Sequence, residues 1–238
     1  MKYLRKFNTA AEYEAYEAGG DLATPNVSLI ADSNEVRYKK LKIDYFSILQ
    51  GDGSAYLIID YYLSNYDRIE VSRSGSAANS LTLGAKSSKM MCAMAVTQEF
   101  KGYFAWRTTA SHFLNIESAG STSPLVLGMV NDGGVYKEKL KQGSISHILY
   151  THDTPPEEVV SDLKLRVFAS TLQDSNDLDN RIFSGRIWYV KIIDSRTEKV
   201  KVHLVPAMKN GVAGMFDMAN GRFYTNVNSA GSFTAYND

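Results

Sequence analysis

Short alternations of apolar and polar residues, each the length of a strand, dominate this chain from about residue 41 onward. In one of them, Ile69 and Val71 alternate with Arg68, Glu70 and Ser72. Successive side chains of a strand point to opposite faces of a sheet, so this segment has one face for a core and one for water. Many such strands separated by turns favour an all-β sandwich or barrel over βαβ units.

The same alternation recurs at residues 163–167 and 200–204. Two other runs, at residues 56–63 and 187–193, are apolar on both faces, which is typical of central strands covered on both sides. A helix that crosses a membrane needs roughly 18 or more apolar residues, and these runs are strand-sized. We therefore expect no membrane partner.

Turn residues punctuate the strands. Asn210-Gly211 and Asn220-Gly221 are the strongest signals, because Asn-Gly tolerates the positive φ values of a type I′ turn between antiparallel strands. Further turns are predicted at residues 51–53, 132–134 and 195–198. The run Pro155-Pro156-Glu157-Glu158 instead predicts a single helical turn within a loop, since Pro and acidic residues favour a helix start.

The first 40 residues have a different pattern. Residues 9–18 are rich in Ala and Glu, follow Asn8 and stop at Gly19-Gly20, which predicts a short helix with Thr9 near its N-cap. Residues 27–31 and 35–38 predict a small hairpin. We divide the chain into an N-terminal docking segment, residues 1–40, and a β-domain, residues 41–238.

Aromatic residues give the N-terminal segment a candidate docking surface. Phe7, Tyr13 and Tyr16 can share one stripe of an amphipathic element, and that stripe must be buried against something. Either a partner protein covers it or it packs on its own domain. Both alternatives remain open from the sequence.

Composition disfavours several classes of function. Lys plus Arg and Asp plus Glu number 26 each, so no net charge attracts nucleic acid. Lys137, Lys139 and Lys141 alternate with Glu138 and Leu140, as in a solvated edge strand. The single cysteine, Cys92, cannot form an intramolecular disulfide and is expected to be a small buried apolar residue. No export signal is recognisable at the N-terminus.

Motifs for catalysis and metal binding are weak. No Gly-x-Ser-x-Gly elbow or Walker A loop occurs, and His147 and His152 would face opposite ways in one strand. One polar loop concentrates oxygen donors that could bind Ca²⁺, although its spacing is not that of an EF-hand. These donors are Asp174, Asn176, Asp177, Asp179 and Asn180. We otherwise expect no cofactor and no enzymatic activity.

Four stretches near the C-terminus carry a family resemblance. They are GRIWYVKIID at residues 185–194, LVPA at 204–207, GVAGMFD at 211–217 and NGRFYTN at 220–226. Together with residues 56–72 and 81–85, they resemble concanavalin A-like, laminin-G-like jelly-roll domains of phage tail, fibre and capsid-decorating proteins. Glycosidases with this fold use a Glu-x-Asp-x-Glu strand, which this chain lacks; Asp177-Leu178-Asp179 comes nearest.

The N-terminal segment carries a second resemblance. Residues 6–16, PNVS at 25–28 and EVRY at 35–38 are similar to a leader of virion proteins from phages of gut Bacteroidales, including the crAss-like group. The two resemblances imply a structural protein of the virion surface, which assembles in the cytoplasm of the host bacterium. Implied partners are capsid, portal or tail proteins, and further copies of the chain, for instance as a trimer; head and tail locations both remain open.

A receptor-binding adhesin is the alternative. In that case Tyr103, Trp106 and Arg107 are the candidates for contact with a host-surface glycan, because sugar faces stack on aromatic rings and Arg donates planar hydrogen bonds. The same run also reads as a strand whose aromatic residues pack in the core.

Overall fold

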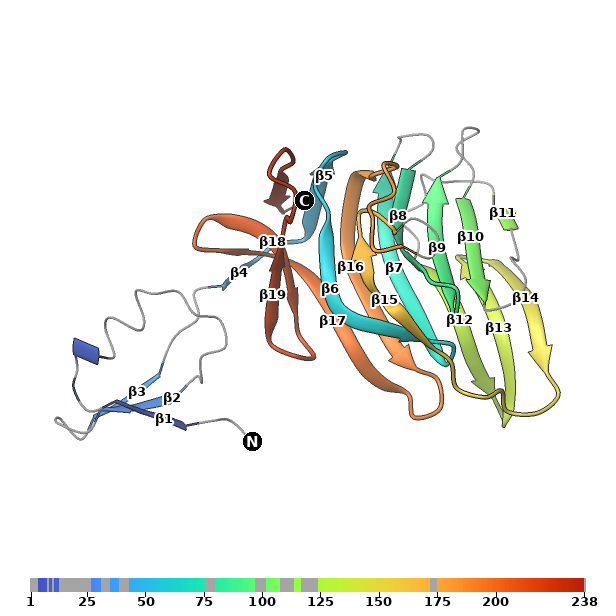
Figure 1. Ribbon diagram of the computed structural model, residues 1–238, viewed down its shortest axis with the longest axis horizontal. Coiled ribbons are helices and arrows are strands. Elements are labelled where there is room, and N and C mark those ends of the chain that lie inside the picture. Colours follow the sequence, from blue (N-terminus) through green and yellow to red (C-terminus); the bar gives the residue numbers. More distant parts are fainter. Residues whose placement is uncertain are drawn as a thin grey trace. The chain divides into compact units, whose positions relative to one another are not determined.

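A computed structural model describes residues 4–7, 9, 11–12, 27–30, 35–38, 43–75, 80–96, 102–107, 114–116, 124–171 and 175–237. The chain divides into two compact units, residues 1–44 and 45–238, which are shown with their strands in Figure 1. Among the described residues, no helix is long and apolar enough to span a membrane.

The first unit contains a small sheet. Strand β1 (Leu4–Phe7) pairs in parallel with β2 (Val27–Ile30), which pairs antiparallel with β3 (Glu35–Tyr38). The backbone N–H of Glu12 donates to Oγ1 of Thr9 over 3.2 Å, as at a helix N-cap. Most of the predicted helix at residues 9–18 lies outside the described residues.

The second unit is an all-β sandwich of two sheets, and its architecture is consistent with the predicted jelly roll. The smaller sheet has the order β11-β10-β9-β8-β15-β6. Its strands are β6 (Leu57–Ser64), β8 (Ser80–Lys86), β9 (Met91–Val96), β10 (Gly102–Arg107), β11 (Leu114–Ile116) and β15 (Val160–Val167).

The larger sheet has the order β14-β13-β12-β7-β16-β17-β18-β19, and β5 pairs with both β16 and β20. Its strands are β5 (Ile48–Asp52), β7 (Asp67–Gly75), β12 (Leu125–Asp132), β13 (Val135–Gln142), β14 (Ile145–His152), β16 (Ser184–Asp194), β17 (Lys199–Lys209), β18 (Val212–Asp217), β19 (Arg222–Thr225) and β20 (Phe233–Tyr236). Strand β4 (Ile43–Tyr45) spans the point at which the two units divide.

Inward-facing aliphatic residues of both sheets form one core. Ile69 and Val71 of β7 face Leu163 and Leu165 of β15 within a single buried cluster, as their alternation predicts. Cys92 belongs to this cluster and is fully buried, which confirms its expected apolar role. Burial at this depth raises the pKa of its thiol.

Two phenylalanines fill the core where backbones approach closely. Phe168 and Phe183 are both fully buried, with ring centroids 5.9 Å apart. A Cβ atom on Gly185 would lie 2.5 Å from Cζ of Phe183, and one on Gly75 would lie 2.4 Å from the same ring. The absence of side chains at these two positions therefore makes room for Phe183.

Strand positions confirm one expectation about central strands and correct another. β16 lies between β7 on one side and β5 and β17 on the other, so the run at residues 187–193 is central, as predicted. β6, which was also expected to be central, is an edge strand of the smaller sheet. Its outward residues, Asp60 and Tyr62, are exposed because no second layer of described residues covers that face.

The two Asn-Gly turns differ in geometry. Asn210 and Gly211 have φ values of 51° and 79°, as the predicted type I′ turn requires. At the second turn only Gly221 has a positive φ, 71°, and its N–H donates to the carbonyl of Asp217. The buried Asp217 carboxylate also accepts the N–H of Ala219, so it dictates a longer turn, and the type I′ prediction is wrong there.

Two further sequence predictions are wrong. Residues 155–159 form no helical turn, because Asn65 holds them extended through bonds to the carbonyl of Glu157 and to both backbone groups of Val159. β13, with its alternating lysines, is not an edge strand, since it pairs with β12 and β14. Glu138 on β13 is consequently buried beside His152 of β14.

The type I′ turn can be tested through Gly211→Ala. An alanine at a φ of 79° is strained, so we expect the free energy of unfolding to fall by about 1 kcal/mol. The neighbouring exposed position serves as the control, where Val212→Thr should change this free energy by less than about 0.5 kcal/mol. Denaturant unfolding measures both; equal effects would contradict the assigned turn.

Candidate functional site

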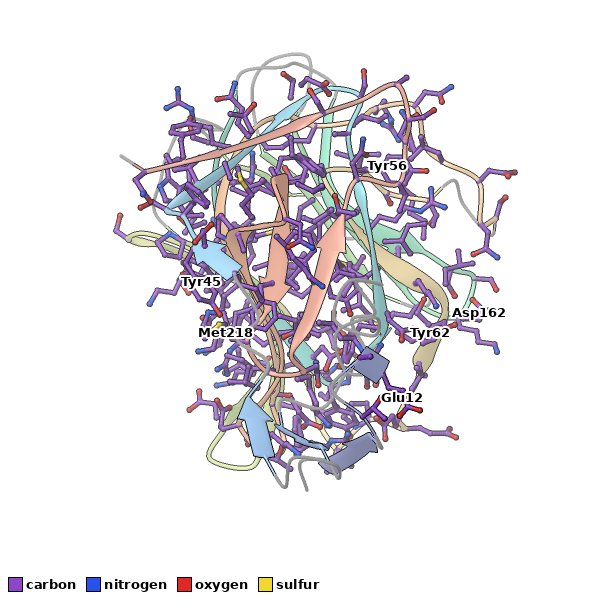
Figure 2. The ribbon with its side chains drawn as sticks, turned by 90° about the vertical axis from the view of Figure 1, so that its left-hand side faces the viewer. Glu12, Tyr45, Tyr56, Tyr62, Asp162 and Met218 are labelled. Atoms are coloured by element: carbon purple, nitrogen blue, oxygen red, sulfur yellow. The ribbon has the colours of Figure 1, made fainter. Side chains whose placement is uncertain are left out.

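A groove lies on the outer face of the smaller sheet, where β6 and β15 run side by side. Its volume is about 460 Å³. We call it the outer groove, and it is lined by Ile58, Tyr62, Asp162, Lys164, Arg166 and Asn176. Antiparallel pairing sets Tyr62 opposite Lys164 and Ile58 opposite Arg166, so alternate residues of both strands point outward together. Figure 2 shows Tyr62 and Asp162 on the same side of the molecule.

Arg166 is the most deeply placed charged residue of the outer groove, with 6% of its surface exposed. Its guanidinium lies 5.5 Å from the ring centroid of Tyr56, and Nη2 donates to the backbone carbonyl of Asn176. Nη1 has no hydrogen-bond partner. Among the described residues no carboxylate forms a direct ion pair with this side chain, but the charge of Asp177 lies close enough to act on it electrostatically. Burial lowers the pKa of Arg166, yet the group stays charged at neutral pH.

Asp60 separates the outer groove from a second cleft. One of its oxygens lies 2.9 Å from Nζ of Lys164, and the other pairs with Arg222. Hydrogen bonds from Lys164 and Arg222 lower the pKa of this carboxyl. The second cleft, of about 420 Å³, is lined by Asp60, Tyr61, Lys201, Asn220, Arg222 and Tyr224.

The loop that was considered for calcium is engaged in internal contacts. The carboxylate of Asp179 is buried and lies 2.6 Å from both Nζ of Lys86 and Nη2 of Arg181. Burial acts to raise its pKa, but the hydrogen bonds from Arg181 and Lys86 outweigh burial and lower it. Asp177 accepts a bond from Ser175, whereas Asp174 lies outside the described residues. Within the described ranges, no group of three or more acids, histidines or cysteines is placed to hold a metal ion.

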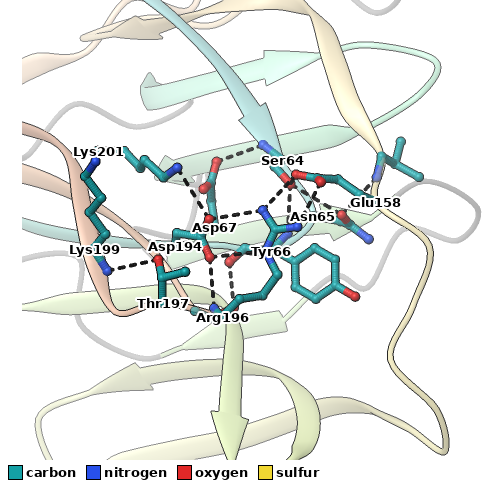
Figure 3. A network of polar contacts seen from close by, with 12 residues as sticks. Ser64, Asn65, Tyr66, Asp67, Glu158, Asp194, Arg196, Thr197, Lys199 and Lys201 are labelled. Atoms are coloured by element: carbon teal, nitrogen blue, oxygen red, sulfur yellow. Dashed lines mark hydrogen bonds and ion pairs between the residues drawn. The ribbon is translucent and has the colours of Figure 1, made fainter.

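A network of polar residues joins the β6–β7 turn, the β16–β17 turn and the loop before β15 (Figure 3). We call it the clasp: Ser64, Asn65, Tyr66, Asp67, Glu158, Asp194, Ser195 and Arg196. Arg196 pairs with Glu158 at 2.8 Å and Asp194 at 3.0 Å, and it lies 4.5 Å from the Tyr66 ring centroid. The bond from Arg196 lowers the pKa of Asp194 to about 2. These contacts tie connecting segments together, so we assign the clasp a structural role.

Asp67 is a buried carboxyl whose pKa lies well above its ordinary range. Burial raises this pKa to about 6, although its oxygens accept bonds from the Ser64 N–H and the Tyr61 hydroxyl. A pKa near 6 would suit a general acid. However, Asp67 is 1% exposed and its contacts are internal, so the geometry gives a substrate no access to it.

The structure describes the backbone of some predicted site residues but not their side chains. Tyr103, Trp106 and Arg107 lie in strand β10, as their pattern predicts, but their side chains fall outside the described residues. Phe7 ends strand β1 rather than joining a helical stripe. Its side chain, and all of Tyr13 and Tyr16, are likewise outside the described residues, so docking through this stripe stays a prediction.

Sequence reasoning missed the outer groove. The alternation in β15 correctly places Lys164 and Arg166 away from the core. The alternation does not reveal that β15 pairs with β6, and this pairing brings Tyr62 beside Lys164. A tyrosine on an outward position of one strand and two basic residues on another were the available signal, but only the fold makes them neighbours.

The raised pKa of Asp67 makes a testable contribution to stability. Its folded-state pKa is about 6 and its unfolded value is about 4, so the folded state binds the proton more tightly and ionisation above pH 6 destabilises the fold. This penalty is lost as pH falls from about 6 to 4. Relative to Asp67→Asn, the wild type should therefore gain up to about 3 kcal/mol over that range. Denaturant unfolding across pH 4–7 measures the difference, and a constant difference would refute the assignment.

Comparisons with known proteins give a weak structural similarity and no similarity in sequence. No protein-family profile matches it, and no curated protein is similar in sequence. Among solved structures, it is similar to the native heptameric SAP-like pentraxin from Limulus polyphemus, with 7% identity and a TM-score of 0.45. That match covers 79% of this chain and 94% of the pentraxin.

Proposed function

We propose that this chain is a non-catalytic structural protein of a phage virion surface, such as a capsid-decorating, head-fibre or tail protein. The proposal is supported by the C-terminal stretches that resemble phage jelly-roll domains. In the structure these stretches are β16, β17, β18 and β19, which are consecutive antiparallel neighbours in one sheet. The C-terminal part of the resemblance therefore falls on four neighbouring strands, and its earlier part, residues 56–72 and 81–85, falls on β6, β7 and β8.

The state of the carboxylates supports a role without catalysis. Asp60, Asp179 and Asp194 are each paired with two basic residues, and their pKa values lie below the ordinary range. Such groups stay ionised at neutral pH and hold no proton to donate. Asp67 is the described carboxyl with the opposite shift, and it is sealed within the clasp.

Division of the chain into two units supports docking through the N-terminal segment. Residues 45–238 contain the complete core of the sandwich, so they have what an independently stable domain requires. We therefore propose that the docking segment, residues 1–40, attaches the domain to capsid, portal or tail proteins, with Phe7, Tyr13 and Tyr16 as the predicted contacts.

Deletion of residues 1–40 in a phage that encodes this chain tests the docking role. We expect the truncated protein to fold and accumulate in infected cells but to be absent from purified virions, as measured by quantitative mass spectrometry. The full-length variant Tyr62→Ser, altered only at an exposed side chain of the sandwich, should be incorporated at the wild-type copy number. Normal incorporation of the truncated chain would show that the leader is not the anchor.

The outer groove favours a second candidate function, recognition of a host-surface glycan. Tyr62 is 44% exposed at its rim, and Asp162, Lys164 and Asn176 supply charged and amide groups around it. An exposed aromatic ring beside convergent polar groups suits a sugar, which has both an apolar face and hydroxyls. Among the described side chains, those of this groove support glycan contact, while the predicted contacts Tyr103, Trp106 and Arg107 stay predictions.

Tyr62→Ser tests glycan recognition by the groove. Loss of the ring should weaken retention on host capsular polysaccharide by about tenfold, because stacking on the sugar face is removed. Tyr45→Ser is the matched control, since Tyr45 is 52% exposed and lies on the opposite side in Figure 2. Affinity chromatography on immobilised polysaccharide compares the three proteins; an equal loss in both variants would argue against the groove.

A further inference from the structure

We propose that the outer groove recognises an acidic glycan, and that Arg166 receives the carboxylate of one of its sugars. This inference rests on the second candidate function above and adds the chemical class of the ligand. It is carried by two groups in one cleft: a nearly buried guanidinium that has no direct ion pair and an unbonded Nη1, and an exposed tyrosine.

The charges of the groove differ in what balances them. Lys164 is neutralised by Asp60 at 2.9 Å. Asp162 lies 3.8 Å from Nζ of Lys89 and accepts a bond from Ser87. Arg166, by contrast, makes no direct ion pair with a described carboxylate, although the charge of Asp177 acts on it from beyond ion-pair distance. It is thus the charge in the groove that still lacks a directly bonded anion.

Arg166 is also incompletely hydrogen bonded. Nη2 donates to the Asn176 carbonyl, and Nη1 is buried without a partner. A buried cation with no directly bonded anion is costly, so an anion that reaches it gains more than it would at an exposed arginine. A carboxylate that displaces the Asn176 carbonyl takes the bond from Nη2, and it reaches the buried Nη1 when the Asn176 segment moves aside. The planar fork of arginine matches the two oxygens of a carboxylate in this way.

The remaining lining points to a sugar as the carrier of that carboxylate. Ile58 lies opposite Arg166 and Tyr62 lies opposite Lys164, and both offer apolar surface on which the C–H face of a pyranose can lie. Asp162 can accept bonds from hydroxyl groups, and the Asn176 side chain can both donate and accept. A volume of about 460 Å³ is in the range of small-ligand sites.

The decisive experiment compares ligands as well as variants. Trisaccharides that contain glucuronate, galacturonate or N-acetylneuraminate are titrated calorimetrically into the full-length protein, each beside its carboxyl-reduced, neutral form. The variants are Arg166→Gln and, as a control matched in charge, Arg186→Gln, an exposed arginine of β16. Thermal unfolding of each variant verifies that it is folded.

At least one acidic trisaccharide should bind the wild type about tenfold to a hundredfold more tightly than its reduced form. Arg166→Gln should abolish that preference, and Arg186→Gln should keep it. If acidic and reduced forms bind equally well to the wild type, the carboxylate assignment is wrong while glycan recognition stands. If neither form of any trisaccharide binds, both fail. Because the reduced sugars leave the protein unchanged, they decide the question even if Arg166→Gln does not fold.

Discussion

The sandwich depends on the hydrogen bonding of β16 along both of its edges. β7 occupies one edge over nearly the whole strand, while β5 and then β17 share the other. Unpaired backbone groups in a dry core are costly, so this strand must be satisfied on both sides before the two sheets can close. Phe183, next to the start of β16, fills the space left open by Gly75 and Gly185. Phe183 and β16 therefore determine both the pairing of the strands and the packing of the core at this place.

Local sequence patterns were sufficient to predict burial and turns wherever a residue's environment is set by its own strand. The alternation around Ile69 and Val71, the burial of Cys92 and the Asn210-Gly211 turn followed from the sequence for that reason. Predictions failed where a distant group overrides local preference. Asp217 reshapes the second Asn-Gly turn, and Asn65 keeps the loop before β15 extended. The neighbours of Arg166 come from β6, β15 and a loop, so no local pattern could assemble them.

β6 and β15 contribute to the core with one face and to the outer groove with the other. Leu163, Leu165 and Ile59 face the core, whereas Tyr62 and Arg166 face the outer groove. Because successive residues of a strand point in opposite directions, the groove can vary with little effect on the core. On this outer face Lys164 is paired directly with Asp60, whereas Arg166 has no direct ion pair.

Because Cys92 is fully buried, the reactivity of its thiol reports on separation of the two sheets. The thiol lies in the core between the sheets, and its raised pKa keeps it protonated and unreactive while they are closed. As the chain has one cysteine, every alkylation event in a native sample marks the same place. The rate of labelling under native conditions therefore measures how often the sheets separate, without any engineered probe.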